Sequence, residues 1–281
     1  MKRTAIVVVV VILGITSWSY GQSYGQNKPA AQTPPAGQAA APAGKRPPQA
    51  KTQPEFDAYK VAAAITDPAA QEKAADDFAT KFPDSELRLL LYKAVMTGYQ
   101  QANNAEKLLA ASQKILTIDP DDPQALLGVS QVLAERTRDT DLDKDQRLAE
   151  ARKDAQRALV TVDTDVPAGL PADKTDVFKG YVRSEAYAIL GTLDFSAKNW
   201  AAAEQNLRKS IDAYPQEVDP VAVFRLSVAL DMQSKYQDAL KYANQAVDLT
   251  KAGTSAGDAA RKEKDRLVQL IGGIPETPAK N

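Results

Sequence analysis

Apolar residues recur at helical spacing from Glu55 to about Leu270, interrupted only by short polar or turn-forming stretches. Apolar side chains at positions i, i+3, i+4 and i+7 lie on one face of a helix, so this pattern predicts a series of amphipathic helices. The breaks at proline, glycine and asparagine divide the series into pairs. The first pair is predicted over residues 56–65 and 71–82, and the second over 89–101 and 105–118.

One insertion falls within the third pair and another falls between the third and fourth pairs. The third pair opens after Pro123, and its second helix carries Ala151, Ala155 and Ala158 on one face. Extra residues around 135–145 predict an extended loop between its two helices. A second insertion over 163–175 must cross to the fourth pair, whose first helix reaches back toward Val177.

The fifth pair spans residues 221–249 and is followed by one more helix over 258–271. That last helix has Lys and Arg on one face and Leu267, Leu270 and Ile271 on the other. A stack of helix pairs exposes an apolar face at its end, and a helix with a polar outer face covers it. We therefore predict that residues 258–271 form a terminal cap.

The stretch from Tyr187 to Pro215 is the most regular copy of the pattern. It resembles the tetratricopeptide repeat in the residues at that family's characteristic spacings, which are Tyr187, Leu190, Gly191, Asp194, Ala203, Leu207, Ser210 and Pro215. The resemblance implies an all-α, right-handed superhelical solenoid of about five helix-turn-helix repeats over residues 55–281, with a C-terminal capping helix. It also implies a non-enzymatic protein that binds protein segments.

Gly191 lies in the middle of a predicted helix, where glycine costs about 1 kcal/mol relative to alanine. A close approach of the next helix is a reason for glycine there, and we expect the small Ala203 to lie against it. Gly128 takes the same place in the third pair. Gly128 and Ala151 are 23 positions apart and Gly191 and Ala203 are 12 apart, which predicts 11 inserted residues in the third pair.

The N-terminus has the order of a secretory signal peptide. Lys2 and Arg3 precede an apolar run over residues 5–15, and Ser19-Tyr20-Gly21 offers small residues for cleavage. We predict a signal peptide over residues 1–21 and export to the periplasm or outside the cell. The alternative is an uncleaved anchor, although the apolar run is short against the ~20 residues that a spanning helix needs.

Residues 22–54 are rich in Ala, Pro, Gln and Gly, a composition that predicts a disordered linker. The charged residues in this linker are all basic: Lys28, Lys45, Arg46 and Lys51. Two interpretations stay open: a basic tail that touches an anionic surface of the cell envelope, and a solvated spacer that holds the repeats away from an attachment point.

Composition excludes much enzyme chemistry. The chain has no cysteine and no histidine, which removes thiol nucleophiles, disulfides, Ser-His-Asp and Cys-His catalysis and the commonest transition-metal ligand. Glycine-rich phosphate loops are absent, and no cofactor is expected. Residues 55–281 hold 29 basic and 36 acidic residues, a balance that disfavours nucleic-acid binding.

In the family that the chain resembles, ligands contact the inner face of the first helix of each repeat. The resemblance places these groove positions at Lys93, Thr97, Gln100, Ala125, Val129, Val132, Ala188, Thr192, Phe195, Phe224, Val228 and Asp231. The family's clamp for a terminal carboxylate pairs a lysine with an asparagine four residues later, whereas Lys93 is followed by Thr97. Phe195, Phe224 and Val228 could instead pack against a neighbouring hairpin, because the same spacing serves a core.

The loop after the third pair's first helix is rich in acids. Oxygen-bearing side chains occupy the first, third, fifth, seventh and twelfth places of a calcium-binding EF-hand loop, at Asp139, Asp141, Asp143, Asp145 and Glu150. Lys144 stands at the sixth place, where that loop needs glycine. We therefore favour the other interpretation, in which Asp143 or Asp145 caps the following helix and complements its dipole, and we expect no metal site.

Two functions of different classes follow. The first is an exported adaptor that binds a protein or peptide segment in its groove, as a scaffold in an envelope or membrane-associated complex. The second is a structural envelope subunit that associates with itself and leaves the groove unused.

Overall fold

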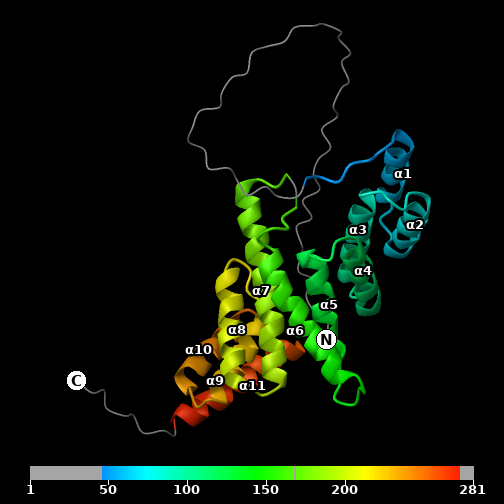
Figure 1. The fold of residues 1–281 in the computed structure, drawn as a ribbon. Helices are drawn as coiled ribbons and strands as arrows, with labels where there is room; N and C mark the ends of the chain where they lie inside the picture. Colours follow the sequence, from blue (N-terminus) through cyan, green and yellow to red (C-terminus); the bar gives the residue numbers. More distant parts are fainter. Residues whose placement is uncertain (1–45, 168, 273–281) are drawn as a thin grey trace, which may run out of the picture. The chain divides into compact units, whose positions relative to one another are not determined.

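The computed structural model describes residues 46–167 and 169–272, so the predicted signal peptide (1–21) and most of the predicted linker lie outside the described residues. The described residues form α-helices and no strand. The helices are α1 (Gln53–Ala63), α2 (Pro68–Lys81), α3 (Leu87–Gln101), α4 (Ala105–Ile118), α5 (Pro123–Arg136), α6 (Lys144–Thr161), α7 (Ala172–Ser196), α8 (Trp200–Ala213), α9 (Pro220–Asp231), α10 (Tyr236–Asp248) and α11 (Ser255–Gly272) (Figure 1).

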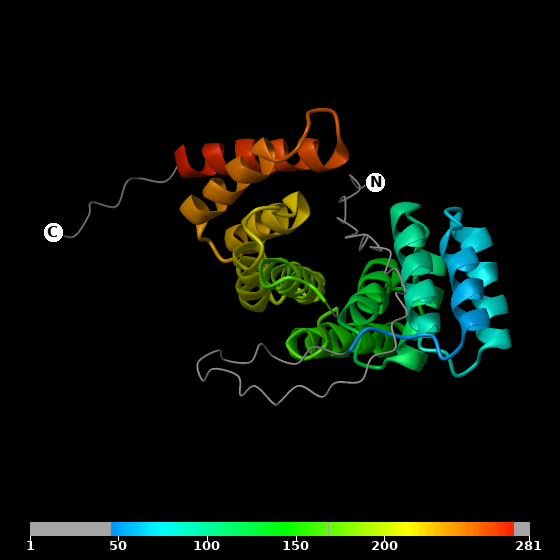
Figure 2. The same ribbon diagram turned by 90° about the horizontal axis from the view of Figure 1, so that it is seen from above.

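Helices that follow one another in sequence pack side by side as hairpins. The hairpins are α1–α2, α3–α4, α5–α6, α7–α8 and α9–α10, and each packs on the next through α2–α3, α4–α5, α6–α7 and α8–α9. The final helix, α11, lies along α10 and also contacts α9 (Figure 2). The predicted all-α stack of helix pairs with a terminal helix is confirmed. Among the described helices, none combines the length and apolar content that a membrane span requires.

Three hairpins turn in the same way. Asn103, Lys198 and Ser234 adopt left-handed backbone conformations with φ of 53°, 59° and 59°. The next residue in each turn donates its backbone N–H to a carbonyl five residues earlier, at 2.9–3.0 Å, and the bonds are Asn104 to Tyr99, Asn199 to Asp194 and Lys235 to Leu230. This closure satisfies carbonyl groups that a helix end leaves free. The repetition of one turn geometry in α3–α4, α7–α8 and α9–α10 indicates that the three hairpins are copies of one unit.

The α5–α6 hairpin lacks this turn. Its chain leaves α5 in an extended conformation at Thr137, and residues 137–143 contain no positive φ. The predicted long loop is therefore present, although it is shorter than the predicted range of 135–145 because α5 continues to Arg136 and α6 begins at Lys144.

Helix starts explain where the observed bounds differ from the prediction. Asp67, Asp122 and Asp219 each precede a proline, and each carboxylate accepts a hydrogen bond from a backbone N–H in the first turn, at 2.8–2.9 Å. Proline fits the first turn of a helix because its missing N–H would be unpaired there anyway. The Asp67-Pro68 pair thus starts α2 three residues earlier than the pattern of apolar residues indicates.

The contact at Gly191 involves a different partner from the predicted one. A β-carbon at Gly191 would lie 2.7 Å from Leu207 Cγ and 3.2 Å from the backbone nitrogen of Leu207, so α8 approaches α7 there as closely as glycine allows. The close approach was predicted, but the residue is Leu207, one turn beyond Ala203. Ala203 is nevertheless fully buried.

The register of the third pair also differs from the prediction. A β-carbon at Gly128 would meet Ser112 of α4, in the preceding hairpin, rather than α6. The contact with α6 is made two residues later, where Ser130 Oγ donates to the carbonyl of Ala151 at 2.6 Å. Ser227 Oγ donates in the same way to the carbonyl of Ala239 at 2.9 Å.

The two serine bonds identify equivalent positions in α5–α6 and α9–α10. Ser130 and Ala151 are 21 positions apart, and Ser227 and Ala239 are 12 apart. The insertion in α5–α6 is therefore nine residues, rather than the 11 predicted from Gly128.

Small side chains fill the inner faces of two second helices. The buried residues of α6 include Ala151, Ala155 and Ala158, and those of α10 are Ala239, Ala243 and Ala246, all fully inaccessible. Larger apolar side chains from the first helices complete each core, such as Leu126 in α5 and Leu226 in α9. Alanine on one side allows the two helices of a hairpin to lie close together.

A polar network joins α2 to the α3–α4 hairpin. Glu72 accepts hydrogen bonds from the Tyr99 hydroxyl at 2.6 Å, from Lys107 Nζ at 3.0 Å and from Lys114 Nζ at 3.3 Å. Burial alone would raise the pKa of Glu72, but these hydrogen bonds lower it to about 2. The carboxylate of Glu72 is therefore held in its charged form by both helices of the neighbouring hairpin.

The chain before α1 is attached to the first hairpins. The Arg46 guanidinium pairs with the Glu86 carboxylate, with Nη1 at 2.8 Å from Oε2, and the backbone N–H of Gln49 donates to the same oxygen at 3.1 Å. The Lys51 N–H donates to Glu55 Oε2 at 2.7 Å. Residues 46–52 thus lie against the start of the repeats, and α1 begins two residues before the predicted domain boundary at 55.

Candidate functional site

The first helices of the later hairpins contact one another directly. The α5 helix packs on α7, and α7 packs on α9. Of the predicted groove residues, Thr192 and Phe195 lie on α7, Phe224 and Val228 lie on α9, and all four are half-buried. The structure thus brings predicted groove positions from two successive hairpins onto adjacent helices.

Hydrogen bonds and ring contacts hold this region in place. Arg225 Nη1 of α9 donates to Thr192 Oγ1 at 2.7 Å, and Thr192 Oγ1 donates to the Ala188 carbonyl at 2.8 Å. The ring of Phe195 meets Trp200 edge to face, with centroids 5.3 Å apart. Phe195 is therefore partly engaged in packing the α7–α8 hairpin and partly accessible.

Asp231, the last of the predicted groove residues, lies at the C-terminal end of α9. Its carboxylate pairs with Arg266 Nη2 of α11 at 2.5 Å, and only 12% of its side chain is exposed. Its charge is thus balanced by the terminal helix.

The predicted groove residues of α5 lie inside the protein. Val129 and Val132 are 1% and 5% exposed and belong to the apolar cores on either side of α5, and Ala125 is fully buried. On α3, Thr97 Oγ1 donates to the Lys93 carbonyl at 3.0 Å, and Gln100 is exposed at the end of the helix. These positions are not surface-exposed as a set, and the groove binding of the whole set stays a prediction.

Lys93, the lysine that corresponds to the family's carboxylate clamp, already has an acidic partner. Its ammonium pairs with Asp122 Oδ2, while the other carboxylate oxygen of Asp122 caps α5. Asp122 is fully buried. An incoming carboxylate would compete with Asp122 for the ammonium group.

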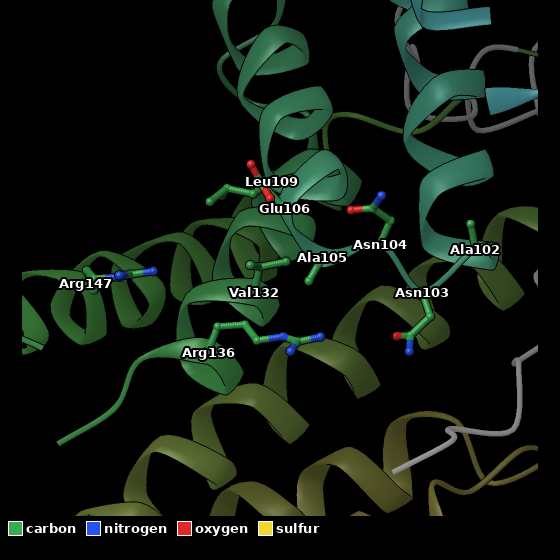
Figure 3. A pocket seen from close by; sticks show the side chains of 9 residues that line it. All are labelled: Ala102, Asn103, Asn104, Ala105, Glu106, Leu109, Val132, Arg136 and Arg147. Atoms are coloured by element: carbon green, nitrogen blue, oxygen red, sulfur yellow. The ribbon is translucent and has the colours of Figure 1, made fainter. Parts of the chain in front are cut away.

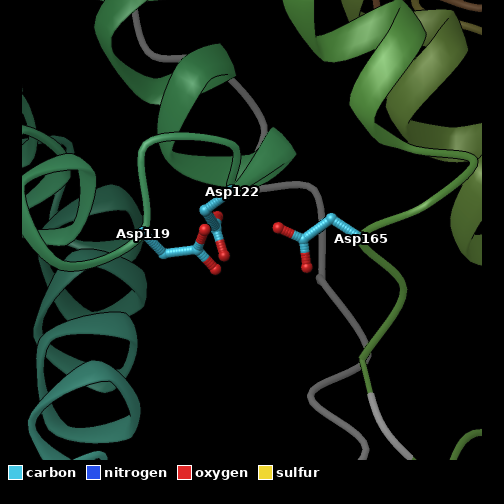
Figure 4. Close-up of side chains that lie close together, drawn as sticks. All are labelled: Asp119, Asp122 and Asp165. Atoms are coloured by element: carbon cyan, nitrogen blue, oxygen red, sulfur yellow. The ribbon is translucent and has the colours of Figure 1, made fainter. Parts of the chain in front are cut away.

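Asp122 also belongs to a cluster of acids. Asp119, Asp122 and Asp165 place carboxylate oxygens within 4.8 Å of one another, and Figure 4 shows the three carboxylates turned toward each other. The three residues come from the α4–α5 connection and from the loop after α6. Clustered carboxylates attract cations, and the cation that the structure places against this cluster is the Lys93 ammonium. No pattern in the sequence brings these three acids together.

The acids of the EF-hand-like stretch over residues 139–150 are not gathered around one point. Asp139 pairs with Lys144 Nζ at 2.7 Å, and Asp141 accepts the Arg138 N–H at 2.9 Å. Asp143 precedes α6 but makes no side-chain cap, while Asp145 lies in the first turn, where an acid complements the helix dipole. Glu150 is exposed on α6. The one group of three close carboxylates in the described part of the chain is the cluster at Asp122.

Asp194 is a buried acid whose contacts the sequence does not predict. Asp194 occupies a position where the repeat pattern has an aromatic residue, and it is 4% exposed. Arg152 Nη2 of α6 and Asn206 Nδ2 of α8 donate to its two oxygens at 2.7 and 2.8 Å. Asp194 thus ties α7 to helices on both sides, which is a structural role.

Comparisons with known proteins add little to these observations. No protein-family model matches the sequence, and no curated protein matches it. Six chains of solved structures match. One, described as "Crystal structure of MamA protein", is 17% identical, with a TM-score of 0.40 over 66% of this chain and 88% of that chain. The similarity concerns the helical fold only, at a TM-score too low to support a functional inference.

Proposed function

We propose that residues 55–281 act as a non-enzymatic scaffold that binds a protein segment along the face of α7 and α9. The observation that carries the proposal is the adjacency of these two first helices, with Phe195 and Phe224 both half-buried and therefore partly open to a ligand. Half-exposed aromatic residues are typical anchors in protein interfaces. The absence of histidine and cysteine from the chain supports a role other than catalysis.

The N-terminal pattern supports export of this scaffold. We propose that the protein works in the periplasm or outside the cell, where the segment before residue 55 connects the repeats to an envelope complex. The test is fractionation of cells that express the full chain, combined with the mass of the exported product. Retention in the cytoplasm would contradict this part of the proposal, and a mass that includes residues 1–21 would favour an uncleaved anchor.

Site-specific photo-crosslinking tests the binding face. Benzoylphenylalanine replaces Phe195 or Phe224 in separate variants, and Val160 serves as the control because it lies on α6 and is 72% exposed. We expect Phe195 and Phe224 variants to crosslink to the same protein in envelope extract and the Val160 variant not to. Capture of that protein from Val160 alone would place the binding face elsewhere.

The same experiment separates the scaffold from a self-associating subunit. Crosslinks from Phe195 and Phe224 only to a second copy of this chain, together with a mass that rises with concentration in light scattering, would favour the structural subunit.

A further inference from the structure

A cleft opens at the edge of the hairpin stack, between the α3–α4 turn and the α5–α6 hairpin. Its volume is about 560 Å³. Its residues come from α4, α5 and α6 and from the turn between α3 and α4, and Figure 3 shows their side chains. The cleft is lined by Ala102, Asn103, Asn104, Ala105, Glu106, Leu109, Val132, Arg136 and Arg147.

The nine-residue insertion in α5–α6 positions the two arginines. In α9–α10, α9 ends four residues after Ser227 and α10 begins three residues before Ala239. In α5–α6, α5 continues six residues past Ser130 to Arg136, and α6 begins seven residues before Ala151, so Arg147 lies in an added turn. Both arginines therefore lie on helical residues that the short hairpins do not have.

The guanidinium groups of Arg136 and Arg147 both have N–H donors without a hydrogen-bond partner among the described residues. Arg136 is exposed and makes no hydrogen bond or ion pair with the described residues. Arg147 Nε is buried and has no hydrogen-bond partner among the described atoms. Its Nη1 forms ion pairs with Asp141 at 3.8 Å and Asp143 at 3.9 Å, which are too long to be hydrogen bonds.

The other lining residues define what fits between the arginines. Half-buried Leu109 provides most of the apolar surface, because Val132 is only 5% exposed. Figure 3 shows Val132 between the side chains of Arg136 and Leu109. Asn103 and Asn104 add side-chain amides, although Asn104 Oδ1 already caps α4 through the Lys107 N–H at 3.2 Å. Glu106 is the acid that lines the cleft, and it lies on the α4 side.

We infer that this cleft binds an acidic segment of a partner protein, with carboxylates paired to Arg136 and Arg147 and aliphatic carbons against Val132 and Leu109. Guanidinium groups bind carboxylates through two parallel hydrogen bonds, which are stronger than bonds between neutral groups. A free Nε with an adjacent Nη offers that geometry at Arg147. An open cleft suits an extended segment, whose glutamate side chains combine a carboxylate with an apolar stem.

The inference rests on the proposed function in taking a protein as the ligand, but it concerns a different surface. The cleft lies at the turns of the hairpins, whereas Phe195 and Phe224 lie on α7 and α9. A partner could therefore engage both surfaces, and each can be tested without the other.

The direct test is a titration with a defined acidic peptide. Acetylated and amidated hexaglutamate, labelled with a fluorophore, is added to the protein at low salt and its anisotropy is measured. We expect saturable binding that weakens as salt rises, because exposed charges are screened. Hexaglutamine with the same label is expected not to bind. Equal binding of both peptides, or no binding of hexaglutamate, overturns the inference.

Substitutions locate the binding. In Arg136→Gln/Arg147→Gln we expect hexaglutamate affinity to fall at least about tenfold, the loss that corresponds to one or two charge-assisted hydrogen bonds. The matched control is Arg138→Gln/Lys153→Gln, which removes the same charge from exposed residues that do not line the cleft. Equal losses in the two double variants would show a general charge effect and contradict a specific cleft.

A second variant keeps both arginines and guards against altered folding. Ala102→Glu adds an acid at an exposed lining position, and we expect it to weaken hexaglutamate binding while circular dichroism stays unchanged. If the affinity of Ala102→Glu for hexaglutamate is unchanged, the peptide does not bind in this cleft and the inference is wrong. Crosslinking from Phe195 is a separate readout, so failure of the face on α7 and α9 and failure of the cleft can be told apart.

Discussion

The α9–α10 and α5–α6 hairpins share a helix contact and differ in how they turn. In each, a buried serine donates to the carbonyl of a buried alanine on the partner helix. The α9–α10 hairpin closes with a left-handed residue at Ser234, whereas α5–α6 contains nine more residues. The helix contact therefore does not depend on the turn, and an insertion at the turn extends both helices outward without changing their register.

This difference has an energetic reason. Lengthening a surface loop costs little, because the closure entropy grows only with the logarithm of loop length. Moving a helix along its partner would instead break every close contact between them. Insertions are thus tolerated at hairpin turns, and there they create surfaces such as the cleft between α4 and α6.

The largest expected effect concerns the tight contact in α7–α8. Gly191→Leu introduces a side chain where even a β-carbon would lie within 2.8 Å of two side-chain atoms of Leu207. We expect a loss of about 1–3 kcal/mol in the free energy of unfolding. Gly272→Leu is the control, since no atom lies within 4 Å of its added β-carbon. Equal melting temperatures for the two variants would show that α8 does not approach α7 this closely.

The second effect concerns acid sensitivity, and it compares the partly buried network at the α3–α4 hairpin with the exposed α5–α6 loop. The folded pKa of Glu72 is about 2 and its ordinary value is 4.5, so its stabilising contribution is complete above pH 4.5 and is lost as pH falls toward 2. We expect on the order of 1–2 kcal/mol of acid-sensitive stability from the α3–α4 network. Glu72→Gln should flatten the fall in melting temperature over this pH range.

Asp139→Asn is the matched control in the α5–α6 loop. Hydrogen bonding to Lys144 lowers the pKa of Asp139, but the carboxylate is exposed and the pair is therefore screened by solvent. We expect its acid profile to match that of the unaltered protein. An equal flattening in Glu72→Gln and Asp139→Asn would remove the distinction between the two hairpins.

The third prediction tests the shared register. Ser130→Ala and Ser227→Ala each remove one buried hydrogen bond, and we expect each to lower the free energy of unfolding by about 0.5–1.5 kcal/mol in urea titration. Similar losses support equivalent positions in α5–α6 and α9–α10. A loss at Ser227 with none at Ser130 would show that the two hairpins do not share this contact.

The smallest effect concerns the turn. Lys198 adopts a left-handed conformation that glycine adopts without steric cost, so we expect Lys198→Gly to stabilise the protein by about 0.5–1 kcal/mol. Thr140→Gly in the α5–α6 loop should bring no such gain, because that loop has no residue with positive φ. Melting temperatures of the two variants give the comparison.

Helix order and pairing were predictable from sequence because they depend on the spacing of apolar residues and on turn residues. Register was less predictable. Gly128 and Ser130 are both small, and the template favours the glycine, whereas only the structure shows that Ser130 finds a carbonyl on α6. Likewise, the sequence favours a small residue opposite Gly191, yet the residue in contact with Gly191 is the larger Leu207.

The candidate surfaces were predictable only in part. The sequence places Phe195 and Phe224 on the first helices of successive pairs, but it does not reveal that Val129 is buried inside the protein. Arg136 and Arg147 carry no pattern that distinguishes them from other charged residues. Their meeting at one cleft depends on where α5 ends and α6 begins, and helix ends near an insertion depend on tertiary contacts rather than local spacing.

The alanine faces of α6 and α10 have a practical consequence for mapping this protein by mutagenesis. Alanine scanning is silent at Ala151, Ala155, Ala239 and Ala243, although these positions set the spacing of the helices. Informative substitutions there are those that add atoms. Replacement by serine or valine in steps of one or two heavy atoms would measure how much room each interface has, and a scan restricted to truncation would report these faces as dispensable.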